Sequence, residues 1–154
     1  MKAITIRQPY ASLILAGLKT FETRSWAPPK ALIGQRIAIH AGAAKPSADV
    51  ADDAAEFVGR NYPLGRVIAT AELTAAYQLA ATRDFVDDPE WAGEATVNPA
   101  TCLGPPLDTF RVGWGDCHFG RWDIGGWAWK LTNVLPVEPF AAKGQLGLWM
   151  VNLP

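Results

Sequence analysis

Cysteine is scarce in this sequence, which has only Cys102 and Cys117 among its 154 residues. The two are too few for a disulfide scaffold, and their spacing does not form a Cys-x-x-Cys pair. The N-terminus also lacks the pattern of a signal peptide, because Arg7 falls inside what would be its apolar region. We therefore expect reduced thiols and a cytoplasmic location.

Charge and long apolar runs are scarce as well. Charged residues make up 19% of the chain and hydrophobic residues 49%, a balance that excludes an intrinsically disordered protein. No apolar run approaches the roughly 18 residues that a membrane-spanning helix requires. We therefore expect one folded domain over residues 1–154 that does not associate with membranes.

The net charge of −1 conceals an uneven distribution along the chain. Residues 1–36 hold six basic side chains and one acid, a net charge of +5. Residues 49–94 hold ten acids and three arginines, a net charge of −7. A basic end on a near-neutral protein favours an anionic ligand such as a nucleotide or a single strand, and does not suit coating of long duplexes. The alternative is that both segments are solvated faces.

Alternating apolar and polar residues predict several short strands, at residues 3–7, 20–26, 34–41, 65–77, 127–131 and 146–151. Helices are predicted at 10–16, which stops at Gly17, and at 47–58, with Ser47 as its N-cap. This order indicates a mainly β, α+β fold, a small mixed β-barrel with one or two helices packed on it.

Proline and glycine accumulate between about residues 83 and 126, which predicts a long loop or lid inserted in the domain. The segment also holds Arg111 and Arg121 among aromatic residues, a combination that suits a base and its phosphate. Packing of the same residues over the mouth of the barrel is an equal alternative. Long loops are commonly functional, and we favour a substrate lid.

The densest polar cluster begins with Arg7-Gln8-Pro9 and continues with Gly17-Leu18-Lys19-Thr20-Phe21-Glu22-Thr23-Arg24. This Gly-x-Lys-x-x-Glu-x-Arg segment after Gln-Pro resembles the ASCH domain family, whose members are relatives of the PUA RNA-binding domains. Three later strands are similar too, at Gly34–Ala41, Gly65–Ala69 and Lys143–Trp149. The resemblance covers most of residues 3–151 apart from the region around 78–110.

The resemblance implies a PUA-like barrel with a cleft beside its first helix that binds RNA or a nucleotide. Some small ASCH-type proteins are amidohydrolases that remove acyl groups from N4-acylated cytidine with a Lys, a Thr and a Glu. Lys19 and Glu72 stand where that Lys and Glu are expected, whereas Glu22 occupies the position of the Thr. The expected function is an RNA- or modified-nucleoside-binding domain with this hydrolase activity. A non-catalytic single-stranded RNA-binding module and a ribonuclease are the alternatives, and a protein-docking module is a third.

The residues themselves are compatible with amide hydrolysis, which needs a base for water, a stabiliser for the oxyanion and an acid for the leaving amine. Lys19 suits the stabiliser, or the base if burial and Arg24 lower its pKa. Glu22 or Glu72 suits the activation of water. The structural alternative is a salt-bridge lattice of Lys19, Glu22 and Arg24 on the rim of the barrel.

Six further residues are candidates for ligand binding: Gln8, Tyr10, Arg24, Trp26, His40 and Arg111. Trp26 shares a strand face with Arg24, so it suits stacking on a base, with core packing as the alternative. Gln8 suits the reading of a base edge or, equally, the bracing of the turn at Pro9. His40 ends an apolar strand and is more typical of a hydrogen-bonded histidine at the core edge.

No metal site or cofactor is expected. The only group of metal-ligating side chains comprises Cys102, Asp116, Cys117, His118 and Asp123, and it lacks paired ligand spacing. A phosphate-cradling glycine loop is also missing, since Gly113-Trp114-Gly115 lacks the rest of the fingerprint.

Overall fold

A computed structural model describes residues 1–83 and 93–154 of the chain. These residues form two compact units that alternate along the sequence. Unit 1 comprises Met1–Leu18, Arg36–Glu72 and Asn133–Pro154, and unit 2 comprises Lys19–Gln35 and Leu73–Thr132. Two long strands, β4 (Arg66–Arg83) and β7 (Trp127–Ala141), run from one unit into the other.

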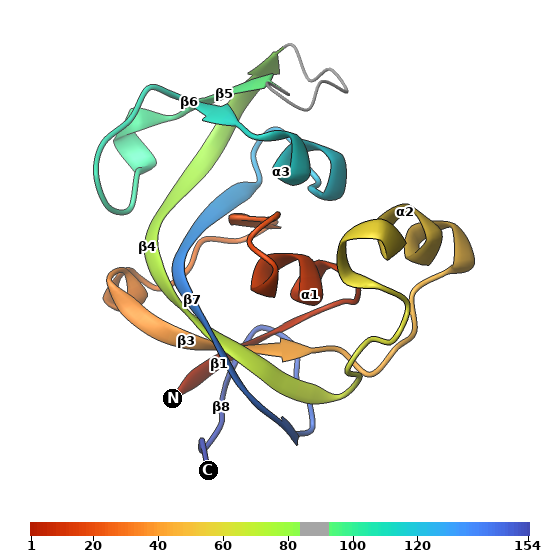
Figure 1. Cartoon of the computed structure of the whole chain (residues 1–154). Helices are drawn as coiled ribbons and strands as arrows, with labels where there is room; N and C mark the ends of the chain where they lie inside the picture. Colours follow the sequence, from red (N-terminus) through yellow and green to blue (C-terminus); the bar gives the residue numbers. More distant parts are fainter. Residues whose placement is uncertain (84–92) are drawn as a thin grey trace. The chain divides into compact units, whose positions relative to one another are not determined.

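In the sheet of unit 1, β1 (Lys2–Ile6) lies between two other strands, which are labelled in Figure 1. On one side β1 pairs in parallel with β3 (Gln35–Ala41), and on the other it pairs antiparallel with β8 (Leu148–Met150). Ala3 lies opposite both Ala38 and Trp149 in this register. Because β1 and β3 are buried along most of their length, their apolar residues form the core of the unit.

Two helices complete unit 1. Helix α1 (Tyr10–Leu15) begins directly after Pro9, as the start residue predicts. Its Leu13 and Ile14 are buried. Helix α2 (Ala48–Val58) has Ser47 at its N-cap position, although the serine side chain makes no capping hydrogen bond. The two helices contact each other.

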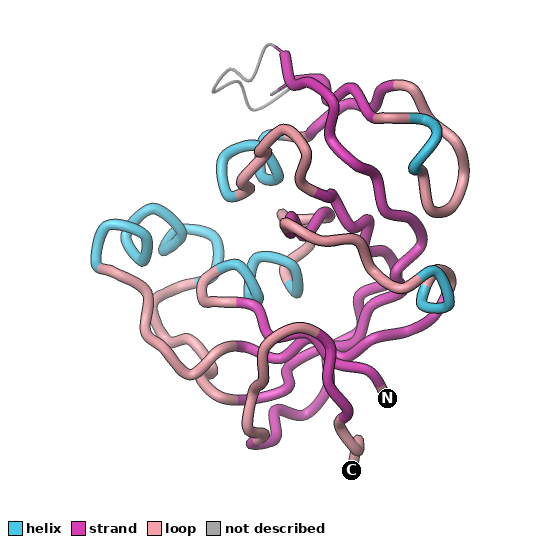
Figure 2. Tube along the Cα trace, turned by 180° about the vertical axis from the view of Figure 1, so that it is seen from behind, coloured by secondary structure: helices cyan, strands magenta, loops and turns pink. Residues whose placement is uncertain are grey.

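Unit 2 is built on β2 (Phe21–Arg24), which pairs antiparallel with β7. Glu22 lies opposite Trp129 in this register, and Arg24 lies opposite Trp127. The far end of β4 pairs with β5 (Gly93–Val97), which in turn pairs with β6 (Thr109–Val112). Strands make up most of the regular structure of the described residues (Figure 2).

Aromatic packing closes the core of unit 2. The ring of Phe21 stacks on that of Phe110 at 4.8 Å between centroids, and Trp122 meets Phe21 edge-on at 5.8 Å. Around them lie the aromatic ring of Tyr77 and a set of small or aliphatic buried residues, Ala75, Leu79, Ala95, Val97, Val112 and Ala128. Burial of such side chains contributes roughly 25 cal/mol per Å² of apolar surface, so this cluster holds β2, β4, β5 and β6 together.

The mainly β, α+β fold is confirmed, and each strand and helix expected from residue patterns is present. The segment expected as a long loop or lid differs, because its described part contains β5, β6, a short helix α3 (Trp114–Phe119) and the turn Pro99–Thr101. Its strands are too short and its glycines too frequent for periodicity to reveal them. Residues 84–92 of that segment lie outside the described part.

The helices within residues 1–83 and 93–154 are all too short or too polar to cross a membrane. The remaining regular element is a single helical turn at Lys30–Leu32.

Candidate functional site

Lys19 lies between the end of α1 and the start of β2, and only 3% of the residue is exposed. Gly17, at a φ of +79°, ends the helix with a left-handed turn that favours glycine. The Lys19 ammonium donates to the carbonyl oxygen of Phe21 and to Glu22 Oε2, the latter at 3.3 Å. A buried ammonium is stable only when such partners replace its water.

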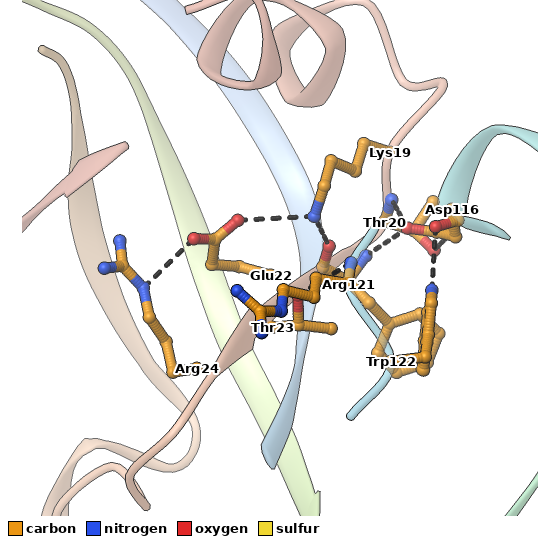
Figure 3. Close-up of polar contacts among 9 residues, drawn as sticks. Lys19, Thr20, Glu22, Thr23, Arg24, Asp116, Arg121 and Trp122 are labelled. Atoms are coloured by element: carbon orange, nitrogen blue, oxygen red, sulfur yellow. Dashed lines mark hydrogen bonds and ion pairs between the residues drawn. The ribbon is translucent and has the colours of Figure 1, made fainter. Parts of the chain in front are cut away.

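Glu22 joins two cations, as Figure 3 shows. Its Oε2 faces Lys19, and its Oε1 lies 3.0 Å from Arg24 Nε. Glu22 and Arg24 share one face of β2 because side chains two apart on a strand point the same way. Two cations therefore flank Glu22 in a site that is largely shielded from water, and the charge of Lys19 also acts on Asp116. Such an environment stabilises an oxyanion.

Asp116, on α3, anchors the start of β2. Its Oδ1 accepts hydrogen bonds from the backbone N–H groups of Thr20 and Phe21, both at 2.8 Å. Its Oδ2 accepts a hydrogen bond of 2.6 Å from the Thr20 hydroxyl. Trp122 Nε1 donates to the Asp116 carbonyl at 2.9 Å. The carboxylate therefore fixes the backbone on either side of Thr20, and with it the position of Lys19.

Burial raises the pKa of the Asp116 carboxyl above its ordinary value. The hydrogen bonds from the Thr20 hydroxyl and the backbone of Phe21, and the charge of Lys19, act in the opposite direction. The sequence patterns assign Asp116 no role, and it is named there only among the metal-ligating side chains that lack paired spacing. A lone aspartate in a short helix carries no local sign of a partner 96 residues away.

A pocket of about 560 Å³ adjoins this polar cluster in unit 2. It is lined by Thr23, Arg24, Ser25, Arg121, Asp123, Ile124, Gly125 and Gly126. Arg24 thus belongs both to the pocket and to the ion pair with Glu22. Arg121 Nε lies 2.6 Å from Asp123 Oδ2, and the Arg121 backbone N–H donates to the Thr23 hydroxyl at 3.3 Å. The pocket has the size of a small-molecule site.

Glu72 belongs to unit 1, where it lies in a polar network of its own. Its Oε1 lies 3.1 Å from Arg36 Nη2, and its Oε2 accepts a hydrogen bond of 2.8 Å from Asn133 Nδ2. Arg36 also donates to the Thr70 hydroxyl at 3.0 Å. Lys19, Glu22 and Arg24 are thus brought together in unit 2, while Glu72 is held by partners in unit 1.

Gln8 is buried and both ends of its amide bind backbone groups. Its Oε1 accepts a hydrogen bond from the Ser12 N–H, and its Nε2 donates to the Pro63 carbonyl, both at 3.1 Å. The alternative in which Gln8 braces the turn at Pro9 therefore accounts for its position. Tyr10 follows as the first residue of α1 and lines a second pocket, described below.

Trp26 and Arg111, two further ligand-binding candidates in unit 2, lie in different environments. Trp26 is half-buried, with its ring edge-on to Trp129 at 4.8 Å, and its carbonyl accepts a hydrogen bond from Trp129 Nε1. Arg111 is exposed on β6, opposite Glu94 of β5 in the strand register. The contacts of Trp26 are therefore those of core packing, the alternative to stacking on a base, whereas Arg111 lies at the surface.

His40 is buried on β3, with 1% of the residue exposed. Its Nε2 donates to the Ala142 carbonyl at 3.0 Å, and its ring meets Trp149 edge-on at 5.4 Å. Burial lowers the pKa of His40 below its ordinary value, although the carbonyl groups of Ala142 and Gly65 act against this shift. These contacts are those of a hydrogen-bonded histidine at the core edge.

Within the part of the chain that the structure describes, no three His, Cys, Asp or Glu side chains gather in a way that would hold a metal ion.

Comparison with known families finds a match to the ASCH domain over residues 4–95. The match spans 92 of the 154 residues, more than half of the chain. A comparison with curated proteins finds no match.

Among solved structures, the chain is similar to the crystal structure of ASCH from Zymomonas mobilis, with 17% sequence identity and a TM-score of 0.48. The similarity covers 98% of this chain and 87% of that one. A point mutant of the same protein gives the same identity and TM-score, with coverage of 98% and 89%.

Replacement of Asp116 tests its anchoring role. In Asp116→Ala three donors lose their acceptor, and we expect the free energy of unfolding to fall by about 3 kcal/mol. In Asp116→Asn the amide oxygen still accepts from the two backbone N–H groups, so we expect a loss of about 1 kcal/mol. Urea denaturation measures both. Asp108→Ala, an exposed aspartate of the same unit, is the control, and an equal loss there would contradict the anchoring role.

His40 makes stability depend on pH. Because its pKa is lowered in the folded state, the unfolded chain binds the proton first as the pH falls below about 6.5. We expect the contribution of His40 to the free energy of unfolding to be intact at pH 7.5 and to decrease between pH 6.5 and pH 5. Urea titrations at each pH measure the slope. His40→Gln should flatten it, and an unchanged slope in the folded variant would contradict this role of His40.

Proposed function

The chain belongs to the ASCH domain family, and from that premise we propose that it binds a modified nucleoside and hydrolyses the amide of an N4-acylated cytidine. The observation that carries the proposal is the buried ion pair of Lys19 and Glu22, extended by Arg24. It supplies the acid, base and positive charge that amide hydrolysis requires.

In the proposed reaction the Glu22 carboxylate accepts a proton from water, and the resulting hydroxide attacks the acyl carbon. The negative charge that develops on the acyl oxygen is stabilised by the ammonium of Lys19. The carbon–nitrogen bond then breaks, and the proton held by Glu22 passes to the exocyclic amine of cytidine. The products are cytidine and a carboxylic acid. Glu22 thereby serves in place of the threonine that related amidohydrolases use.

The pocket of about 560 Å³ supports this proposal, because it offers room for a nucleoside beside Arg24, which pairs with Glu22. Its hydroxyl groups, on Thr23 and Ser25, and its backbone groups at Gly125 and Gly126 suit the ribose and the polar edges of a base. Arg24 joins this pocket to Glu22, so a ligand that moves the guanidinium would also change the environment of the proposed base.

Hydrolysis of N4-acetylcytidine by the wild-type protein, followed by the absorbance change on conversion to cytidine, tests the proposal. We expect turnover to fall at least about 100-fold in Lys19→Met, which keeps the alkyl chain but loses the charge. Glu22→Gln should lose a similar or larger factor, because the amide cannot accept the proton from water. Lys19→Ala should behave as Lys19→Met does.

The matched control is Lys130→Met on β7, an exposed lysine opposite Phe21, which should retain wild-type turnover. Thermal denaturation of every variant separates loss of chemistry from loss of fold. If the wild-type protein releases no acetate, or if Lys19→Met and Glu22→Gln are folded and retain full turnover, the proposal is wrong.

Glu72 is the second proposed carboxylate, by its resemblance to the glutamate of the related amidohydrolases. Glu72→Gln keeps the shape of the side chain and one acceptor for Arg36 or Asn133. A folded Glu72→Gln protein with little turnover would assign it a part in catalysis, whereas full turnover would limit it to its network in unit 1.

The alternative functions are a non-catalytic module for single-stranded RNA and a ribonuclease. Arg24 in the pocket and the basic character of residues 1–36 favour an RNA ligand. RNA binding that weakens with added salt, without release of acetate from the nucleoside, would identify the binding module. Shortening of the bound RNA would identify the ribonuclease.

We also propose a cytoplasmic location. Cys102 and Cys117 form no disulfide within the described residues, which is typical of proteins in reducing compartments and supports this assignment.

A further inference from the structure

A second pocket, of about 430 Å³, lies in unit 1 between the start of α1 and the segment that precedes α2. Its lining comes from two stretches of the chain, Arg7, Gln8 and Tyr10 on one side and Ala44, Lys45, Pro46, Ser47 and Val50 on the other. The volume is that of a small-molecule site, and larger than a bare inorganic ion requires.

The charge of this pocket is positive and is not neutralised by the protein. Arg7 and Lys45 both line it, and none of the lining residues is acidic. Neither cation forms an ion pair within residues 1–83 and 93–154, whereas Arg36 and Arg60 of the same unit pair with Glu72 and Asp52. Two unpaired cations facing one pocket favour an anionic ligand, and a phosphate accepts from both.

The pocket also holds groups that suit the remainder of a nucleotide. Tyr10 contributes a half-buried aromatic ring, and Ser47 contributes a hydroxyl at the N-cap of α2. Neither hydroxyl has a hydrogen-bond partner among the residues that the structure describes. An aromatic ring beside cations is the combination that proteins use to hold a base or sugar next to its phosphate.

The walls of the pocket are held in place before any ligand binds. Gln8 braces one wall by its hydrogen bonds to Ser12 and Pro63, so Arg7 and Tyr10 lie on a fixed turn. The opposite wall begins at Ala44, and two residues before it the Gly42 N–H donates to the Ile6 carbonyl at 2.8 Å. Pre-organised walls reduce the ordering that binding requires.

We propose that this pocket binds the phosphate of a nucleotide, with Arg7 and Lys45 as the phosphate ligands and Tyr10 against the adjoining sugar or base. The inference goes beyond the proposed function, because it assigns phosphate recognition to residues of unit 1 and requires no hydrolysis. It rests on the proposed function only for the choice of a cytidine nucleotide as the ligand.

Isothermal titration with cytidine 5′-monophosphate, cytidine and inorganic phosphate tests the proposal. We expect the wild-type protein to bind the monophosphate at least about tenfold more tightly than cytidine. Arg7→Ala and Lys45→Ala should each weaken binding of the monophosphate about tenfold, and the double variant about 100-fold, with little change for cytidine. Lys143→Ala, an exposed lysine elsewhere in unit 1, is the matched control and should bind as the wild-type protein does.

Two results would overturn the proposal: equal affinity of the wild-type protein for cytidine and its monophosphate, or retention of the phosphate preference in the folded double variant. A short single-stranded oligocytidylate distinguishes the source of the phosphate. Tighter binding of the oligonucleotide than of the monophosphate, again lost in the double variant, indicates RNA, and the reverse order indicates a free nucleotide.

The same titrations with Lys19→Met separate the two proposals. Because that variant lacks the proposed catalytic ammonium, its phosphate preference should persist while hydrolysis is lost. The hydrolysis assay in turn uses a nucleoside without phosphate, so its failure would not affect the phosphate site.

Discussion

The burial of the Lys19 ammonium is the constraint on which the candidate site depends. Because Lys19 is only 3% exposed, its ammonium needs a carboxylate partner in place of water. Glu22, three residues later, provides that carboxylate. That pairing requires the chain to pass directly from the Gly17 turn into β2, since only then does Glu22 lie on the same side as Lys19. Arg24 follows from the strand itself, because it shares the face of Glu22. The polar cluster and the start of β2 are thus one structural feature.

Among the described residues of unit 2, two carboxylates are buried, and the difference in their surroundings separates their roles. Asp116 accepts its hydrogen bonds from neutral donors, two backbone N–H groups and a hydroxyl, and burial raises its pKa although the charge of Lys19 acts against this shift. Glu22 faces two cations. The hydrogen bonds of Asp116 fix the backbone, whereas the ion pairs of Glu22 create a charged site. Two carboxylates thus have different roles because their environments differ. Helix α3 therefore supports the site from within a segment rich in glycine and proline.

Elements with a strong local pattern could be predicted, and elements without one could not. The alternation in β1, β2 and β3 and the start and stop residues of α1 and α2 identify all five. Strands β5 and β6 are four or five residues long and lie between prolines and glycines, so their pairing is set by partners rather than by pattern. Strand β7 continues through Pro136 and Pro139, although proline usually ends a strand, because both prolines are exposed and their fixed φ fits an extended chain.

The sequence by itself determined the family motif and the local placement of Lys19, Glu22 and Arg24. Side chains two apart on a strand share one face, which places Glu22 with Arg24, and the glycine that ends the helix places Lys19 just before that strand. It also determined the alternation that makes the fold mainly β. Only the tertiary structure decided that Asp116 holds the backbone of Thr20, that Gln8 braces Pro63, and that Glu72 joins Arg36 and Asn133. These contacts join residues 36 to 96 positions apart, and hydrogen bonds of that separation follow from the packing of whole elements, which no local pattern of residues encodes.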